Sequence, residues 1–116
     1  MTTELIVSFT VDGIHFWPDA PEQYKEFGQP HRHPFKFVCW MPVEVLSSAD
    51  RPVELWELRQ RAITVVVNTF HINMTNVCDF GEMSCEGIAQ WLKDVMPGFS
   101  KVYCGEEYWL GAMCYE

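Results

Sequence analysis

The sequence predicts an α+β domain with the element order ββααββ, and three patterns support this prediction. Residues 4–15 and 33–45 alternate apolar and polar side chains in part, with the two-residue period of a half-buried strand. Residues 47–70 and 84–96 carry apolar side chains at the spacing of an amphipathic helix. The last stretch, residues 100–116, supplies one or two closing strands. Strands and helices that come in separate runs are typical of the α+β class.

The two N-terminal strands are separated by a clear loop signal. The first strand, "ELIVSFTVDGIHFW", ends near His15. Residues 18–30 then contain three prolines and a glycine, which favour turns over regular structure. The second strand follows at once, and His31 and His33 lie at its start.

The first helix is expected within residues 47–70. Ser48 or Asp50 can cap its N-terminus, and Pro52 suits its first turn. The β-branched second half of this segment also fits a strand. We prefer a helix because the helical pattern is continuous over a wide apolar face formed by Val53, Leu55, Trp56, Leu58, Ala62, Ile63, Val66 and Val67.

The second helix has sharper end signals. Ser84 can cap it, Glu86 favours its first turn, and the pair "PG" ends it after Met96. Residues 71–83, between the helices, are expected to be a connecting segment without a strand.

Length and charge exclude several classes of protein. A chain of 116 residues with 48% hydrophobic residues is expected to form one globular domain, residues 1–116. The net charge of −8 argues against general nucleic-acid binding, because an acidic surface repels phosphate backbones. No apolar run is long enough to cross a membrane, and no secretory signal is visible, so we expect a cytoplasmic protein. Five cysteines without a C-x-x-C pair argue against a disulfide framework or a thiolate zinc site.

The histidines point to a metal site. Side chains in a strand alternate between its faces, so His31 and His33 project to the same side. If the first two strands pair in antiparallel fashion, His15 approaches both of them. Three neutral imidazoles form a catalytic-type zinc site with a fourth position open. An H-x-H pair also occurs on loops and surfaces without a metal, and the residues alone leave that alternative open.

Four motifs in the same order resemble the 6-pyruvoyltetrahydropterin synthase and 6-carboxytetrahydropterin synthase family. His15 followed by "HRH" resembles the family's lone histidine and H-G-H, and "ELWELR" resembles the D-F-x-x-L-K that opens its first helix. "MSCEGIAQWL" resembles P-T-x-E-N-x-A-x-W/Y-hydrophobic at the second helix, and "VYCGEEY" resembles V-x-V-x-E-T. The resemblance implies a T-fold, which is an antiparallel ββααββ sheet with two helices on one face that oligomerises into a β-barrel.

The resemblance also implies roles for individual residues. His15, His31 and His33 would bind Zn²⁺, and Glu106 would anchor a pterin ring. A carboxylate suits that role because it accepts two parallel hydrogen bonds from a pterin or guanine edge. Ser84 and Cys85 would lie beside the ring. From the residues alone, an exposed charge at a strand end is the preferred interpretation of Glu106. For Ser84 and Cys85, helix capping and packing are an equally good interpretation.

The sequence departs from the family pattern at the groups that move protons. Phe27 stands where the family has its catalytic cysteine, and Phe70 replaces the aspartate of an Asp-His pair, of which His71 is retained. Arg32 replaces the glycine of H-G-H. One branch of the family uses a glutamate in place of the cysteine, and Glu26 is adjacent to that position but one residue out of register. We therefore name Glu26 and His71 as the catalytic candidates; by sequence, Asp19 and Glu22 are the other acids nearby.

Three functions remain open at this stage. The first is a zinc-dependent, pterin-synthase-like lyase that acts on dihydroneopterin triphosphate or a related pterin, in 7-deazaguanine (queuosine-type) or tetrahydropterin biosynthesis. The second is an inactive relative that binds or sequesters a purine or pterin ligand. The third is a structural oligomer with neither activity. An oligomer is expected because the closing strands are too apolar for a solvated surface; they carry Tyr103, Tyr108, Trp109, Leu110, Met113 and Tyr115. The family resemblance implies a trimer or hexamer in which Glu106 would face histidines of a neighbouring chain.

Overall fold

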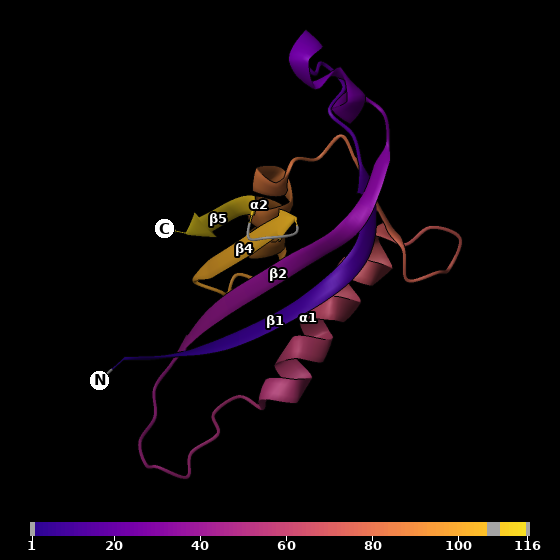
Figure 1. The fold of residues 1–116 in the computed structure, drawn as a ribbon. Coiled ribbons are helices and arrows are strands. Elements are labelled where there is room, and N and C mark those ends of the chain that lie inside the picture. The colour runs from indigo at the N-terminus through magenta and orange to yellow at the C-terminus, as the bar shows by residue number, and fades with distance from the viewer. Residues whose placement is uncertain (1, 107–109, 116) are drawn as a thin grey trace.

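A computed structural model describes residues 2–106 and 110–115 and shows one sheet with helices packed against it (Figure 1). The expected Tyr108 and Trp109 of the closing strands lie outside the described residues. Along the chain, the elements are β1 (Thr3–His15), the 3₁₀ segment η1 (Glu22–Gly28), β2 (His31–Val43), α1 (Leu55–Phe70), β3 (Cys78–Gly81), α2 (Cys85–Val95), β4 (Lys101–Glu106) and β5 (Leu110–Tyr115).

The strand order in the sheet is β3-β1-β2-β4-β5. All neighbouring pairs are antiparallel except β3, which runs parallel to β1. The α+β class is confirmed, but β3 corrects two expectations, since the segment between the helices contains a strand and the sheet is mixed. The four residues of β3, "CDFG", are too few for a periodicity to show, and tertiary pairing with the end of β1 decides their conformation.

The long hairpin of β1 and β2 supplies six of the buried core residues, which are Val7, Phe9, Val11, Phe35, Phe37 and Cys39. In β1 the inward side chains alternate with largely exposed ones, whereas in β2 the buried run includes Val38 as well. The register places Phe9 opposite Phe37 and Val11 opposite Phe35. The rings of Phe9 and Phe37 stack at a centroid distance of 4.9 Å. Burial of these aromatic side chains fixes which face of the hairpin turns inward, since a register slip of one residue would expose them all.

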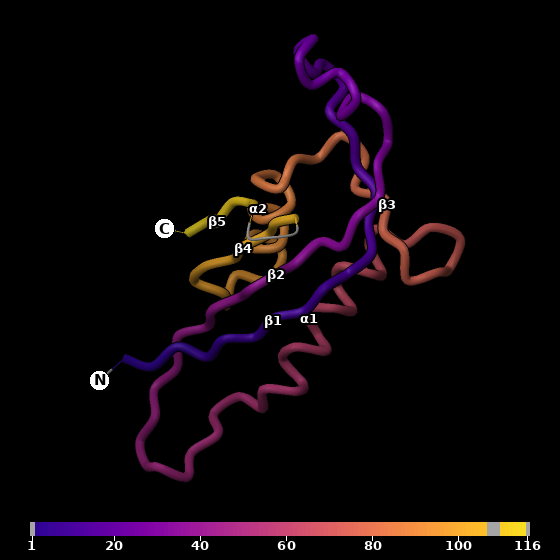
Figure 2. The backbone as a smooth tube through the Cα atoms, viewed as in Figure 1, coloured from indigo at the N-terminus to yellow at the C-terminus, as the bar shows by residue number. Residues whose placement is uncertain are grey.

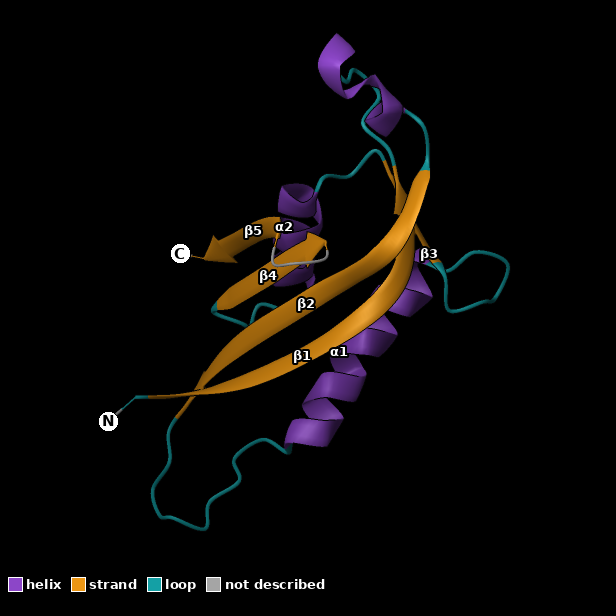
Figure 3. Ribbon diagram, viewed as in Figure 1, coloured by secondary structure: helices purple, strands orange, loops and turns teal. Residues whose placement is uncertain are grey.

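Both helices cover the same face of the sheet, as expected (Figure 3). The α1 helix buries Leu58, Ala62 and Val66, which are spaced four residues apart and lie on one side of the helix. The α2 helix buries Cys85, Ile88, Ala89 and Leu92. The apolar face of α1 is narrower than the sequence suggested, because Trp56 is 76% exposed.

The cap of α1 differs from the expected one. The carboxylate of Glu54 accepts hydrogen bonds from the backbone N–H groups of Trp56 and Glu57, so the helix begins at Leu55. Asp50 instead accepts from the N–H groups of Leu46 and Ser47 in the preceding turn, and these hydrogen bonds lower the pKa of its carboxyl. At α2 the expectation is confirmed, because the Ser84 hydroxyl oxygen accepts from the N–H of Gly87 at 3.1 Å.

Neither helix covers the opposite face of the sheet (Figure 3), and this face carries exposed apolar side chains. One cross-strand row joins Ile6, Trp40, Lys101 and Tyr115, and the next joins Ser8, Val38, Tyr103 and Met113. Ile6 is 57% exposed and Tyr115 is 63% exposed. This outer face is the part of the fold that bears on assembly.

The backbone trace shows where the site lies (Figure 2). The η1 segment extends from the far end of the β1–β2 hairpin, at the opposite end from the N-terminus. β1 ends and β2 begins at the base of this excursion, and the loop into α2 passes the same region. None of the helices in the described part of the chain is long and apolar enough to span a membrane.

Candidate metal centre and adjoining pocket

The three predicted histidines come together at the end of the hairpin. His15 is the last residue of β1 and pairs with His31, the first residue of β2, while His33 lies two residues further along β2 and pairs with Gly13. The Nε2 atoms of His15 and His33 are 3.3 Å apart. The antiparallel pairing on which the sequence argument depended is therefore present.

Glu106 joins this group from the end of β4. Its Oε1 atom lies 3.1 Å from Nε2 of His15, 2.9 Å from Nε2 of His33 and 4.0 Å from Nε2 of His31. The expectation that Glu106 would face the histidines of a neighbouring chain is corrected, because it contacts those of its own chain. β4 pairs directly with β2, and this pairing places the end of β4 beside the histidines.

The donor set fits a zinc ion. The ligand atoms of the three histidines and Glu106 all lie within 4.8 Å of one another and could hold a metal. Zn–N bonds of about 2.0–2.1 Å in a tetrahedron place the ligand atoms about 3.3 Å apart. The 3.3 Å between His15 and His33 matches that spacing, and the contacts of Glu106 are close to it.

Backbone carbonyls set the tautomers of the imidazoles. Nδ1 of His15 lies 2.9 Å from the carbonyl oxygen of Met83, while Nδ1 of His31 and of His33 lie 3.2 Å from the carbonyls of Gln29 and Pro34. A carbonyl oxygen only accepts, so each Nδ1 carries the proton and each neutral ring presents its Nε2 lone pair to the cluster. Three lone pairs and a carboxylate oxygen then converge, and this arrangement requires a cation or an added proton between them.

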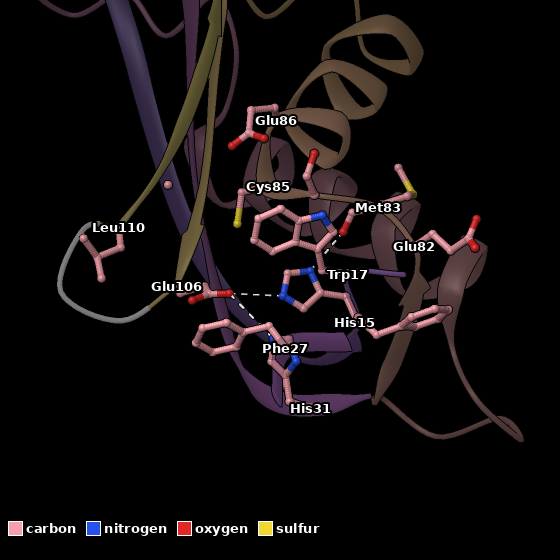
Figure 4. A pocket seen from close by; sticks show the side chains of 13 residues that line it. His15, Trp17, Phe27, His31, Glu82, Met83, Cys85, Glu86, Glu106 and Leu110 are labelled. Carbon is pink, nitrogen blue, oxygen red and sulfur yellow. Dashed lines mark hydrogen bonds and ion pairs between the residues drawn. The ribbon is translucent and has the colours of Figure 1, made fainter. Parts of the chain in front are cut away.

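A pocket of about 530 Å³ opens beside the cluster (Figure 4). His15, His31 and Glu106 form one part of its wall. The remaining lining residues come from the strand end after His15, from η1, from the start of α2 and from β5; they are Phe16, Trp17, Phe27, Glu82, Met83, Ser84, Cys85, Glu86, Leu110 and Gly111.

Ser84 and Cys85 line this pocket and also serve their helix. Ser84 caps α2, and Cys85, the first helical residue, is largely buried. A hydrogen bond with the Cys104 thiol lowers the pKa of Cys85 and raises that of Cys104. Capping, packing and a position beside a ligand are therefore compatible for this pair.

The predicted proton carriers lie outside the pocket of the single chain. Glu26 is exposed on η1, and His71 lies at the C-terminus of α1, where its Nδ1 accepts a hydrogen bond from the N–H of Met74 at 3.2 Å. Neither residue is among those that line the pocket, whereas Phe27 is. Their catalytic roles stay predictions that depend on a second chain or on movement of η1.

Sequence reasoning missed several residues of the site. Trp17 and Glu82 belong to no motif, and Met83 and Glu86 lie within "MSCEGIAQWL" but were given no role at the site. The position of Trp17, two residues after His15, could have indicated its role, because residues that directly follow a metal ligand at a strand end lie close to the metal site.

Comparisons with known proteins support the fold. No family model and no curated protein matches this sequence. Among solved structures, 6-pyruvoyl tetrahydropterin synthase from Caenorhabditis elegans matches with a TM-score of 0.68 and 14% identity, over 100% of this chain and 96% of the other. An uncharacterized protein from Wolinella succinogenes matches with a TM-score of 0.64 and 11% identity, over 100% and 99% of the two chains.

The fold and the site together define the class. The protein is an α+β protein with a cluster of three histidines and a glutamate that could bind a metal. Its fold, the T-fold, is similar to that of 6-pyruvoyl tetrahydropterin synthase, at 14% sequence identity.

Proposed function

We propose that the protein binds Zn²⁺ through His15, His31 and His33, holds a pterin or purine-type ring in the adjoining pocket, and acts on dihydroneopterin triphosphate or a related pterin. The observation that carries this proposal is the convergence of imidazole Nε2 atoms and a carboxylate oxygen beside a pocket of about 530 Å³. Tetrahydropterin and 7-deazaguanine biosynthesis are the pathways in which such a reaction belongs.

The residues around the metal have separable tasks in this proposal. Bound zinc supplies a Lewis acid that lowers the proton affinity of a ligand hydroxyl or carbonyl. The carbonyl of Met83 fixes the ring of His15, so that the imidazole keeps its orientation. All contacts of Glu106 with the histidines run through Oε1, which leaves its second oxygen to accept a hydrogen bond from a ring N–H or amino group.

The proposed bases for proton removal lie outside the pocket of the single chain. A base must lie within hydrogen-bonding reach of the proton it takes. We assign this role to Glu26 or His71, and it requires the approach of η1 or of another subunit, because neither side chain lines the pocket in the single chain.

A second candidate function is ring binding without turnover. Phe27 favours it, since this residue lines the pocket at the position where the resembled family carries a proton-accepting cysteine. A phenyl ring cannot accept a proton, but it can stack on a planar ligand.

One experiment separates the two functions. The zinc-loaded protein is incubated with dihydroneopterin triphosphate and the products are separated by chromatography, while calorimetry measures binding of dihydroneopterin. Product formation that falls in Glu26→Gln or His71→Ala supports the enzyme, and strong activity in both variants would show that other residues carry the proton. Binding without product supports the second function. Absence of both binding and turnover in zinc-loaded protein overturns the ring-binding proposal.

A further inference from the structure

The pocket wall next to the metal cluster is aromatic and held in place. The backbone N–H of Trp17 donates to the carbonyl of Phe27 at 2.8 Å, which closes the neck of the η1 excursion and sets the two residues side by side. Tyr24 contacts both rings, with centroid distances of 6.1 Å to Trp17 and 6.3 Å to Phe27. We call Trp17 and Phe27, which line the pocket, the aromatic wall; Tyr24 contacts both rings from outside the pocket lining.

The aromatic wall is exposed although its rings are large and apolar. Trp17 is 46% exposed and Phe27 is 44% exposed, and both line the pocket. The ring of Phe27 also lies 5.8 Å from that of His31, so the wall reaches the metal cluster. Figure 4 shows Trp17 and Phe27 together with Glu106 around the pocket. Exposed rings in a concave site are suited to stack on a planar ligand.

The charged side chains of the pocket lining are acidic, and the proposed Zn²⁺ beside Glu106 is a positive charge at this wall. Glu82, Glu86 and Glu106 line the pocket, and no lysine or arginine occurs among its described lining residues. Of the basic residues near this end of the hairpin, Lys25 pairs with Glu22 at 3.4 Å and Arg32 pairs with Asp12 at 2.9 Å. The start of α2 brings no free anion site either, because Ser84 caps it and Glu86 occupies its first turn.

The aromatic wall and the acidic lining together discriminate between pterins with and without phosphate groups. A triphosphate carries several negative charges at neutral pH and is normally held by lysine, arginine or an uncapped helix N-terminus. In this pocket, a triphosphate would face the carboxylates of Glu82 and Glu86, which are also negatively charged. An uncharged ring with N–H and amino groups suits the wall, since the carboxylates accept its hydrogen bonds and the aromatic side chains stack on its faces.

We infer that the ligand of this pocket is a planar pterin or purine-type ring without phosphate groups, stacked on Trp17 and Phe27. The inference rests on the proposed function and narrows its substrate class. Phe27, which cannot replace the missing proton carrier, then acts as a specificity-determining residue.

The test is calorimetry on the zinc-loaded, full-length protein with two probes, dihydroneopterin and dihydroneopterin triphosphate. Because a triphosphate can extract zinc, the metal content is measured again after each titration. We expect dihydroneopterin to bind at least about tenfold more tightly at physiological salt, where charges of like sign near a pocket still repel. Phe27→Leu should weaken binding of dihydroneopterin about three- to tenfold, the range of an aromatic pair.

Charge reversal supplies a matched control. Glu86→Lys should narrow the difference between the two probes, and Glu82→Lys should do the same without altering a helical first turn. Glu57→Lys is the control, because Glu57 also lies in the first turn of a helix but does not line the pocket. Circular dichroism on each variant establishes that it is folded.

The outcomes are distinct. Triphosphate binding as tight as that of dihydroneopterin, with zinc retained and no response to Glu86→Lys or Glu82→Lys, overturns the inference and leaves the proposed function intact. If zinc-loaded protein binds neither probe, ring binding itself fails and the inference fails with it.

Discussion

Oε1 of Glu106 lies 2.9 Å from Nε2 of His33, so the end of β4 meets the start of β2 in one cluster. The two side chains come from strands that are neighbours in the sheet but far apart in the sequence. In this position, a single carboxylate can serve a metal through one oxygen and a ring through the other. The assignment of roles to Glu106 is thus the central question for experiment.

Metal content is the first measurable consequence. We expect about one zinc per chain in the purified protein, because the described residues hold one cluster of ligand atoms, all within 4.8 Å of one another. His31→Ala or His33→Ala should abolish zinc binding, as measured by atomic emission after dialysis. His71→Ala is the matched control and should retain zinc, since His71 lies outside the cluster. A protein that stays metal-free after zinc supplementation contradicts the site.

The role of Glu106 in ring binding can be measured separately. Glu106→Gln should weaken binding of a pterin or guanine-like ligand by about 1.5–3 kcal/mol, the usual value for a hydrogen bond to a charged group. Zinc content is measured on the same samples, so that loss of the metal is distinguished from loss of the ring contact. Unchanged affinity in calorimetry would place the ring elsewhere in the pocket.

Buried thiols predict a loss of stability at alkaline pH. Burial raises the pKa of Cys39 from 9.0 to about 12 and that of Cys78 to about 11. The folded state therefore holds these protons more tightly than the unfolded state. The resulting stability is complete below pH 9.0 and is lost as the pH rises toward 12.

The contribution of the buried Cys39 thiol is isolated by comparing how steeply the free energy of unfolding falls with pH in the native protein and in Cys39→Ala. For Cys39, raising the pH from 9 to 11 should lower the free energy of unfolding by about 2 kcal/mol, an order-of-magnitude value. Urea unfolding at several pH values measures this change. Cys39→Ala should be less stable at pH 7 but should show a shallower decline above pH 9. Equal slopes in both proteins would remove the buried thiol as the cause.

Assembly is the last expected outcome. The outer face of the sheet presents Ile6, Met113 and Tyr115, which are 57%, 46% and 63% exposed. β5 forms one edge of the sheet, and closing several sheets into a barrel would pair such edges and cover the apolar face. We expect a trimer or hexamer in light scattering at micromolar concentration. A dimer that covers one edge is the simpler alternative, and a stable monomer rules the barrel out.

The local sequence determined those features that depend on neighbouring residues. The alternation of β1 and β2 was visible because each strand buries one face, and Ser84 was readable as a cap because capping is local. The spacing of His31 and His33 placed both imidazoles on one side of a strand for the same reason.

Tertiary structure decided the features that depend on distant segments. β3 forms because the end of β1 offers it a partner, and the carbonyl of Met83 contacts His15 across a separation of 68 residues in the sequence. Glu106 reaches the histidines through the pairing of β2 with β4. The sequence by itself thus identified the three histidines as candidate metal ligands. Chain folding, which brings groups together irrespective of their separation in sequence, decided what surrounds them.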